Sequence, residues 1–192
     1  TTAGPLSGNT VNDCDWGMWV HDGAEAGDIV SNEVTNCATV GAGVCDEALV
    51  GDVTGNTFSS CPYGFGVAGD ARAQSISRNT VSHNTVGISV CLSQADSIRD
   101  NMISDTTERG ITVGGNAVVA DVTDNVTTNC GWSGVQVCDG AVVERVTANT
   151  ITGTGYGVVV ERSARVDHLN RNSVSQAPWQ AFWIRAAVGE LA

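Results

Sequence analysis

The residues best suited to proton transfer in this chain are His83, Asp105, Glu108 and Arg109. A histidine titrates near neutral pH and, beside carboxylates, can move protons to and from a sugar hydroxyl. An arginine can hold a carboxylate in a two-point contact. Such a set predicts catalysis only if the fold brings the segments around positions 83 and 105 together. The alternative interpretation is an ordinary exposed turn, where charged residues are common.

Seven aromatic residues recur at related places and predict a surface that binds sugars. Five of them follow an asparagine by seven residues and two lie slightly further along, near the chain ends: Trp16, Tyr63, Trp132, Tyr156 and Trp179, then Trp19 and Trp183. Exposed aromatic faces stack on the C–H faces of sugar rings. The alternative is a set of rings that pack on one another and shield a loop. Val86 and Glu108 take the aromatic place in two middle units, whereas Phe65 and Phe182 are expected in the core.

An asparagine followed by a hydroxyl-flanked aliphatic residue organises the chain. It returns every 22 to 24 residues, at Asn9, Asn32, Asn56, Asn79, Asn101, Asn125, Asn149 and Asn172. A glycine runs in phase with it, and Ala181 takes the eighth place after Gly17, Gly41, Gly64, Gly87, Gly110, Gly134 and Gly157. Two markers at one steady period predict a stacked repeat architecture.

Each unit of about 23 residues predicts three short strands. Aliphatic residues stand three places before and two places after the asparagine, as Ile76 and Val81 do around Asn79. The glycine is followed by an inward pair such as Ile88 and Val90. This alternation is typical of strands, and no sustained 3.6-residue apolar stripe predicts a helix. Because one coil cannot close its own core, coils must stack roughly 4.8 Å apart. The asparagine is expected at a corner in left-handed geometry, with its amide bonded to the coils above and below.

The corner Asn79-Thr80-Val81-Ser82 and the strands that begin at Gly87, Gly110 and Gly157 resemble the right-handed parallel β-helix superfamily. The repeats are similar to those of pectate-lyase-like proteins, the NosD-type family, and β-helix domains that bind or hydrolyse sugars. The resemblance covers all eight coils and implies an all-β, right-handed parallel β-helix. It also implies that the asparagine corner lies between the second and third strands. The outer face of the glycine-led sheet would then form the substrate groove, in an extracellular or cell-surface protein.

The fold class does not decide the function, because this architecture carries lyases, hydrolases, epimerases, tailspikes and adhesins. The Asp-Asp pair and Arg-x-Lys motif of polygalacturonase-like hydrolases are absent, as is any lysine that could serve a lyase. We predict a protein that binds an extended polysaccharide and, as an enzyme, would be a lyase, hydrolase or epimerase. The alternative is a non-catalytic surface, adhesin or tailspike-like stalk, the last a trimer. A third is an ice-binding solenoid, because hydroxyl pairs such as Thr80 and Ser82 recur.

The length and net charge of the chain limit the number of domains and the classes of partner. The 192 residues fit one domain, 1–192, and 21 acidic against 9 basic residues give a net charge of −12. The electrostatic field of this negative charge repels a nucleic-acid backbone. No apolar run is long enough to span a bilayer, so membrane insertion is not expected. No signal peptide is visible, and we expect a mature or excised domain.

Seven cysteines fall into two repeat columns, Cys14, Cys37, Cys61 and Cys130 in one and Cys45, Cys91 and Cys138 in the other. The preferred interpretation is free thiols that act as small apolar side chains, since no C-x-x-C metal spacing occurs. A disulfide joining Cys37 to Cys14 or to Cys61 is the alternative.

Acidic residues also recur before the asparagine, at Asp28, Asp52, Asp96, Asp121, Glu144 and Asp167. A solvated acidic edge is the preferred reading, with no cofactor, and bound calcium is the alternative.

Overall fold

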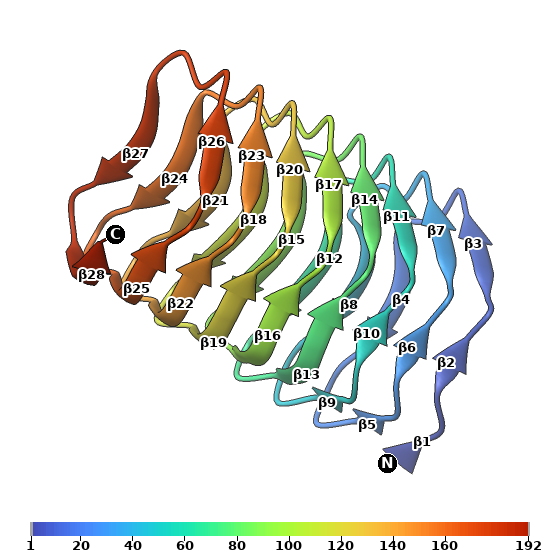
Figure 1. Ribbon diagram of the computed structural model, residues 1–192. Helices are drawn as coiled ribbons and strands as arrows, with labels where there is room; N and C mark the ends of the chain where they lie inside the picture. Colours follow the sequence, from blue (N-terminus) through green and yellow to red (C-terminus); the bar gives the residue numbers. More distant parts are fainter. Residues whose placement is uncertain (1, 192) are drawn as a thin grey trace.

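A computed structural model describes residues 2–191 as a stack of parallel coils without a helix in that range. Figure 1 shows the coils following one another from the N-terminal end (blue) to the C-terminal end (red). Three parallel sheets run along the stack, and two of them contain one strand from each of eight coils. The predicted all-β parallel solenoid of about eight coils is therefore confirmed. The part of the chain that the structure describes contains no helix long and apolar enough to cross a membrane.

The 12-stranded sheet, here sheet A, precedes the asparagine corner of each coil. Its strands are β1 (Thr2–Ala3), β2 (Leu6–Ser7), β5 (Glu25–Ala26), β6 (Ile29–Val30), β9 (Leu49–Val50), β10 (Val53–Thr54), β13 (Arg72–Ser77), β16 (Gln94–Arg99), β19 (Val118–Thr123), β22 (Val142–Thr147), β25 (Arg165–Asn170) and β28 (Ala187–Leu191). In the first three coils this strand is divided in two. Asp28 lies at one such break, where its carboxylate accepts a bond from the amide of Asp52.

Sheet B follows the asparagine corner and is built from three-residue strands. They are β3 (Thr10–Asn12), β7 (Glu33–Thr35), β11 (Thr57–Ser59), β14 (Thr80–Ser82), β17 (Met102–Ser104), β20 (Val126–Thr128), β23 (Thr150–Thr152) and β26 (Ser173–Ser175). The asparagine thus lies between the second and third strands of a coil, as the resemblance implied.

Sheet C holds the glycine-led strands. They are β4 (Trp16–Val20), β8 (Val40–Val44), β12 (Tyr63–Ala68), β15 (Val86–Cys91), β18 (Arg109–Gly114), β21 (Ser133–Val137), β24 (Tyr156–Val160) and β27 (Gln180–Ile184). The predicted inward pairs are buried, with Ile88 and Val90 at 0% exposure. Phe65 is likewise buried and stacks on Phe58, with ring centroids 5.7 Å apart. Phe182 differs from its prediction: it is 41% exposed, because β27 is the terminal strand of sheet C.

The eight asparagines form one continuous hydrogen-bonded column, as predicted. The backbone N–H and the side-chain Nδ2 of Asn79 both donate to Oδ1 of Asn101, each at 3.0 Å. Nδ2 of Asn79 also donates to the Val53 carbonyl at 2.9 Å. The predicted left-handed geometry belongs instead to the preceding residue, with φ of 53° at Arg78 and 56° at Asp100. The turn is therefore made one residue earlier, which leaves the asparagine free to direct its amide along the stack.

The glycine column exists because the coils approach closely there. A Cβ on Gly87 would lie 2.5 Å from the carbonyl oxygen of Gly110, and one on Gly64 would lie 2.7 Å from that of Gly87. No side chain fits between such backbones. The glycine thus starts each strand of sheet C flat against the next coil, and fixes which residues of that strand face outward.

Candidate functional site

The central outward column of sheet C is a row of small side chains closed at both ends by tryptophan. The strand pairing places its members in the order Trp19, Gly43, Gly66, Ser89, Thr112, Gln136, Val159 and Trp183. Seven steps of roughly 4.8 Å separate the two indoles by about 34 Å. From Trp19 as far as Glu161 the outer face of the sheet is hollowed, whereas Val159, beside Trp183, is fully buried. This depression, from Trp19 to Glu161, is called the trough below.

Two hollows make up the trough and meet at Ser89 and Cys91. The first, of about 340 Å³, is mainly apolar and is lined by Trp16, Trp19, Thr39, Val40, Val44, Tyr63, Gly66, Val67 and Ala68 besides those two. The second, of about 350 Å³, is called the central hollow and adds Arg109, Thr112, Gly114, Gly115, Trp132, Gln136, Cys138, Asp139, Glu161 and Arg162. Because they share residues, one extended ligand could occupy both.

At the N-terminal end of the trough, Trp16 and Trp19 pack edge to face. Their ring centroids are 4.5 Å apart, and Trp16 is 49% exposed. The indole of Trp19 lies over Gly43, where a Cβ would come within 2.2 Å of the ring. Glycine at that position therefore lets the ring lie flat on the sheet.

At the C-terminal end, four rings form a second cluster. Trp132 lies 5.1 Å from Tyr156 and 5.9 Å from Trp179, and Tyr156 stacks on Trp183 at 4.7 Å between centroids. These separations are typical of favourable aromatic pairs. Six of the seven predicted rings thus form two clusters with a gap, rather than one row, and the seventh, Tyr63, lines the first hollow. The clustered rings pack on one another and also leave exposed faces, since Trp179 is 55% exposed.

Along the edge of the trough, the residues that the strand pairing places side by side differ from those predicted by counting seven residues from each asparagine. The paired column is Trp16, Val40, Tyr63, Val86, Arg109, Ser133, Tyr156 and Gln180. Arg109, not Glu108, fills the gap beside Val86, and Trp132 and Trp179 lie one residue before the column. The reason is that some coils carry one more residue between the asparagine and the strand. Glycine is the ninth residue after Asn101 but the eighth after Asn79.

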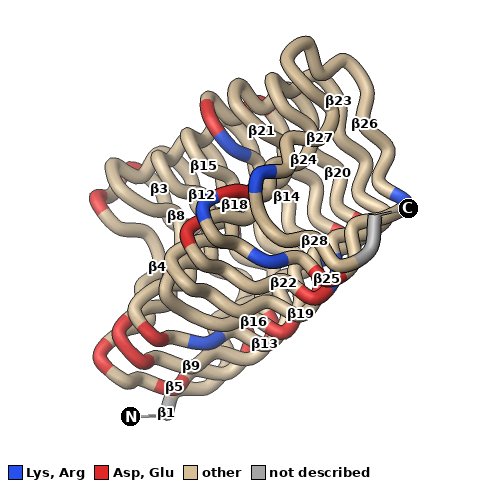
Figure 2. The backbone as a smooth tube through the Cα atoms, turned by 90° about the vertical axis from the view of Figure 1, so that its left-hand side faces the viewer, with Lys and Arg blue, Asp and Glu red and all other residues tan. Residues whose placement is uncertain are grey.

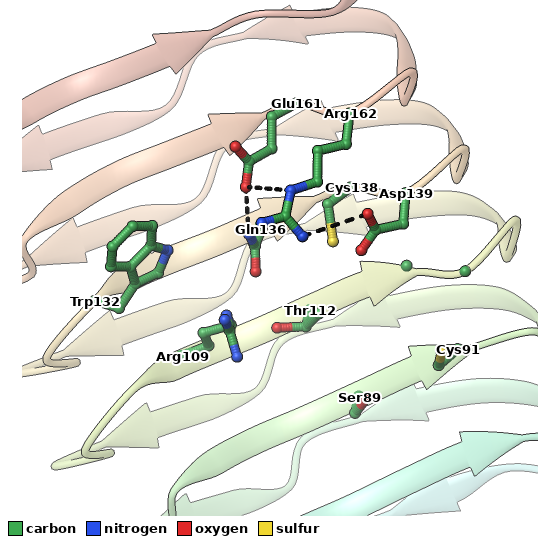
Figure 3. A pocket seen from close by; sticks show the side chains of 12 residues that line it. Ser89, Cys91, Arg109, Thr112, Trp132, Gln136, Cys138, Asp139, Glu161 and Arg162 are labelled. Carbon is green, nitrogen blue, oxygen red and sulfur yellow. Dashed lines mark hydrogen bonds and ion pairs between the residues drawn. The ribbon is translucent and has the colours of Figure 1, made fainter.

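Three hydrogen-bond donors in the central hollow have no partner. Nε of Arg109, Oγ1 of Thr112 and Nε1 of Trp132 are all buried atoms without a hydrogen bond. They come from β18 and from the loop before β21, and Figure 3 shows Trp132 and Arg109 along one side of the hollow. Buried donors are costly to leave unsatisfied. The arrangement therefore suits a polar ligand or ordered water that accepts hydrogen bonds.

The opposite side of the central hollow offers acceptors. Gln136, only 4% exposed, donates from Nε2 to Oε1 of Glu161 at 2.9 Å. Arg162 lies 3.5 Å from Asp139 and 4.0 Å from Glu161. Burial, and then the hydrogen bond to Asp139, raises the pKa of the Cys138 thiol to about 12. Cys138 is therefore a neutral thiol at physiological pH, and the carboxylates are the acceptors of this side.

The four predicted catalytic residues lie in two separate pairs. His83 and Asp105 occupy the same corner position in adjacent coils, both with left-handed φ, at 57° and 54°. Hydrogen bonds from Asn129 and Ser104, and then the charge of His83, lower the pKa of Asp105. Arg109 pairs with Glu108 at 2.8 Å, at the edge of the trough. Among the described residues, no hydrogen bond or ion pair joins the two pairs.

Sequence reasoning found Arg109 and Trp132 but missed Thr112, Gln136 and Glu161 as parts of the same hollow. A signal for Glu161 was present. It stands four residues after Gly157, a place that holds cysteine after Gly41, Gly87 and Gly134. A buried carboxylate in a column of small, weakly polar side chains needs a hydrogen-bond donor nearby. Here that donor is Gln136.

The recurring acids of sheet A are mostly paired with arginine. Asp96 contacts Arg72 at 2.7 Å, and Asp121 and Glu144 both contact Arg145. Further acids follow one another along the turns near β5 and β9 (Figure 2), where Asp22, Asp46 and Asp70 line one open hollow. Within residues 2–191 no group of three or more His, Cys, Asp or Glu side chains is arranged to hold a metal ion.

The comparisons with known proteins give one family. The family model described as periplasmic copper-binding protein (NosD) matches residues 39–180, almost three quarters of the chain. A search of curated proteins and a search of solved structures found no match. The match spans six of the eight asparagine corners and the whole central hollow. On this evidence the chain belongs to the NosD family, and its fold is a parallel β-helix.

Proposed function

We propose that this protein binds an extended, neutral polysaccharide in the trough. The observation that carries the proposal is the central hollow, whose lining combines three unpartnered donors, one of them Nε1 of Trp132, with the carboxylates of Asp139 and Glu161. A sugar hydroxyl both accepts and donates hydrogen bonds, so it complements both sides of such a site. The aromatic clusters at either end supply faces on which pyranose rings can stack. The trough spans six coil steps of roughly 4.8 Å, about 29 Å, and this length favours a chain of several sugars over a single one.

The local charge favours a neutral chain over an acidic one. Arg109 and Arg162 are the two guanidiniums at the central hollow, and they are accompanied by Glu108, Asp139 and Glu161. Arg109 is thus already engaged by a carboxylate through Nη1, and its Nε is a buried donor without a partner. A uronate arriving here would meet more negative than positive charge. Hydroxyl groups carry no such penalty.

The family description names the periplasm and copper. We propose that this chain also acts outside the cytoplasm, in agreement with a sugar-binding role. Copper sites in proteins draw on thiolate, imidazole and thioether ligands held close together. Among the described residues, no three or more His, Cys, Asp or Glu side chains are grouped so that they could hold a metal ion, and the contact between Cys14 and Cys37 joins only two thiols. The described residues therefore do not fit a copper site with three or more His, Cys, Asp or Glu ligands, and the proposed function does not include one.

The proposal is for binding, and polysaccharide processing remains a prediction. His83 and Asp105 do not line the central hollow, so their suggested acid–base role needs a separate test. A panel of polysaccharides incubated with the protein and assayed for new reducing ends or unsaturated products would provide it. Retention of any observed activity in the His83→Ala and Asp105→Ala variants would rule out their catalytic role.

The binding test uses a panel of soluble neutral polysaccharides and isothermal titration calorimetry. We expect Trp132→Ala to weaken the affinity roughly fivefold or more, because a half-buried aromatic anchor and an N–H donor are removed together. Met102→Ala is the matched control, since Met102 is an exposed apolar residue of sheet B at 61% exposure. A second variant, Gly66→Trp, should block the trough without disturbing the fold, because a Cβ there meets open space.

Two results would contradict the proposal. One is a panel in which no polysaccharide binds the folded protein. The other is a bound polysaccharide whose affinity is unchanged in both Trp132→Ala and Gly66→Trp. The second result would place the glycan on another face, such as the hydroxyl-lined sheet B.

A further inference from the structure

Two cysteines in the first two coils touch each other through their sulfur atoms. The Sγ atoms of Cys14 and Cys37 are 3.1 Å apart. Both belong to the column that follows sheet B, and their backbones are hydrogen-bonded neighbours through Ala38 N–H and the Cys14 carbonyl at 2.8 Å. Adjacent coils are roughly 4.8 Å apart, which lies inside the Cα separation of about 4.4–6.8 Å that disulfides require. The spacing of the two coils is therefore compatible with a bond between them.

We propose that Cys14 and Cys37 form a disulfide that fastens the first coil to the second. The sulfurs need to approach by about 1 Å to reach the bond length of about 2.05 Å. A soft metal bridging two thiolates in a line, at about 2.3 Å per bond, would instead hold the sulfurs about 4.6 Å apart. The contact distance therefore favours the covalent bond over a bridging ion. The oxidising compartment in which we propose that the chain acts allows such bonds to persist.

Cys61 is the rival partner for Cys37, and its contacts argue against it. Its sulfur donates to the Ser59 carbonyl at 3.2 Å and accepts the Cys37 amide at 3.3 Å. Both Cys37 and Cys61 are 3% exposed, whereas Cys14 is half-buried. An external oxidant can therefore reach Cys14 before either of the others. The reaction should begin at that sulfur.

The bond forms by two thiol–disulfide exchanges with a small disulfide such as oxidised glutathione. The thiolate of Cys14 attacks one glutathione sulfur and releases the first glutathione thiol. The thiolate of Cys37 then attacks the Cys14 sulfur and releases the second. Two protein thiols are oxidised and one glutathione disulfide is reduced to two thiols. Burial, and then the contact with Cys14, raises the pKa of Cys37, so the second exchange should accelerate with increasing pH.

The test oxidises the full-length reduced protein with glutathione disulfide at about pH 8.5, near the usual cysteine pKa, in the presence of a chelator. Remaining thiols are then alkylated, and the intact mass is measured. We expect two thiols to resist alkylation and the mass to fall by two hydrogens, with reversal by dithiothreitol. Trypsin leaves residues 1–72 in one piece because Arg72 is the first arginine of a chain without lysine, so the linked peptides are mapped after cleavage at acidic residues.

Three variants decide the pairing. Cys14→Ser and Cys37→Ser should both abolish the linkage, and Cys61→Ser should retain it. The proposal is overturned if no thiol pair forms in the wild-type protein. It is equally overturned if the linkage survives in Cys14→Ser and is lost in Cys61→Ser, which would identify Cys37–Cys61 as the bond. Neither result depends on whether the trough binds a polysaccharide.

Discussion

At the scale of single residues, the stability of the solenoid depends on whether each buried hydroxyl group has a hydrogen-bond partner. Thr127 and Thr154 are both buried, at 0% and 1% exposure. Oγ1 of Thr154 donates to the Tyr156 carbonyl at 2.8 Å, whereas Oγ1 of Thr127 has no partner. Thr127 also stands in an inward column between Ile103 and Ile151, where the repeat otherwise supplies an aliphatic side chain. The two threonines therefore make opposite contributions.

We predict that Thr127→Val stabilises the protein and that Thr154→Val destabilises it. Removing the unpaired hydroxyl relieves a desolvation penalty of about 1–3 kcal/mol, whereas removing the paired one loses a bond worth about 1 kcal/mol. Urea unfolding of the two variants and the wild type measures both changes. Because the substitution is the same at both positions, a change of the same sign in both would show that the hydroxyl partners do not decide the effect.

At the scale of the structural element, the asparagine corner joins neighbouring coils. The sequence was sufficient to predict the eight-coil stack and the column, because asparagine and glycine repeat visibly and each has a physical requirement in the fold. The sequence was not sufficient to predict the edge of the trough. One additional residue before the strand, as between Asn101 and Gly110, shifts the loop but leaves both markers in place. Spacing from the asparagine therefore put Glu108 where the backbone pairing puts Arg109.

Interior and terminal members of the asparagine column should differ in their contribution to stability. Asn101 is fully buried, accepts two bonds from Asn79 and donates to Asn125 and the Ile76 carbonyl. Asn172, at the last corner, is half-buried, so water can replace its bonds. We expect Asn101→Ala to cost roughly 3 kcal/mol or more, since several buried groups lose partners, and Asn172→Ala about 1 kcal/mol.

Guanidinium chloride unfolding, followed by far-ultraviolet circular dichroism, compares the two variants. A solenoid transmits stability between adjacent coils, so the interior substitution should also broaden the transition. Equal losses at the two corners would show that burial of the column is not what makes it stabilising.

At the scale of the whole molecule, the charge of the chain acts on any ligand that approaches the trough. The net charge is −12, and arginine supplies all the positive charge. Most of these arginines are engaged with carboxylates on the same surface, as Arg72, Arg145 and Arg162 are. They therefore neutralise local acids rather than create a basic patch. This long-range property can be read from composition, whereas the central hollow emerges only when four coils are stacked in register.

The repulsive field predicts opposite salt responses for two classes of polysaccharide. A polyuronate approaching the acidic surface should bind more tightly as salt rises, because screening at about 0.1 M reduces repulsion beyond roughly 10 Å. A neutral polysaccharide bound through hydroxyl groups and ring stacking should keep its affinity within about twofold over the same range. Calorimetric titrations at low and moderate salt, with polymers matched in length, measure both. A polyuronate whose affinity falls as salt rises would show that Arg109 and Arg162 attract it locally. The central hollow would then act on a ligand as a positive site, which contradicts the excess of carboxylates over guanidiniums that we infer there.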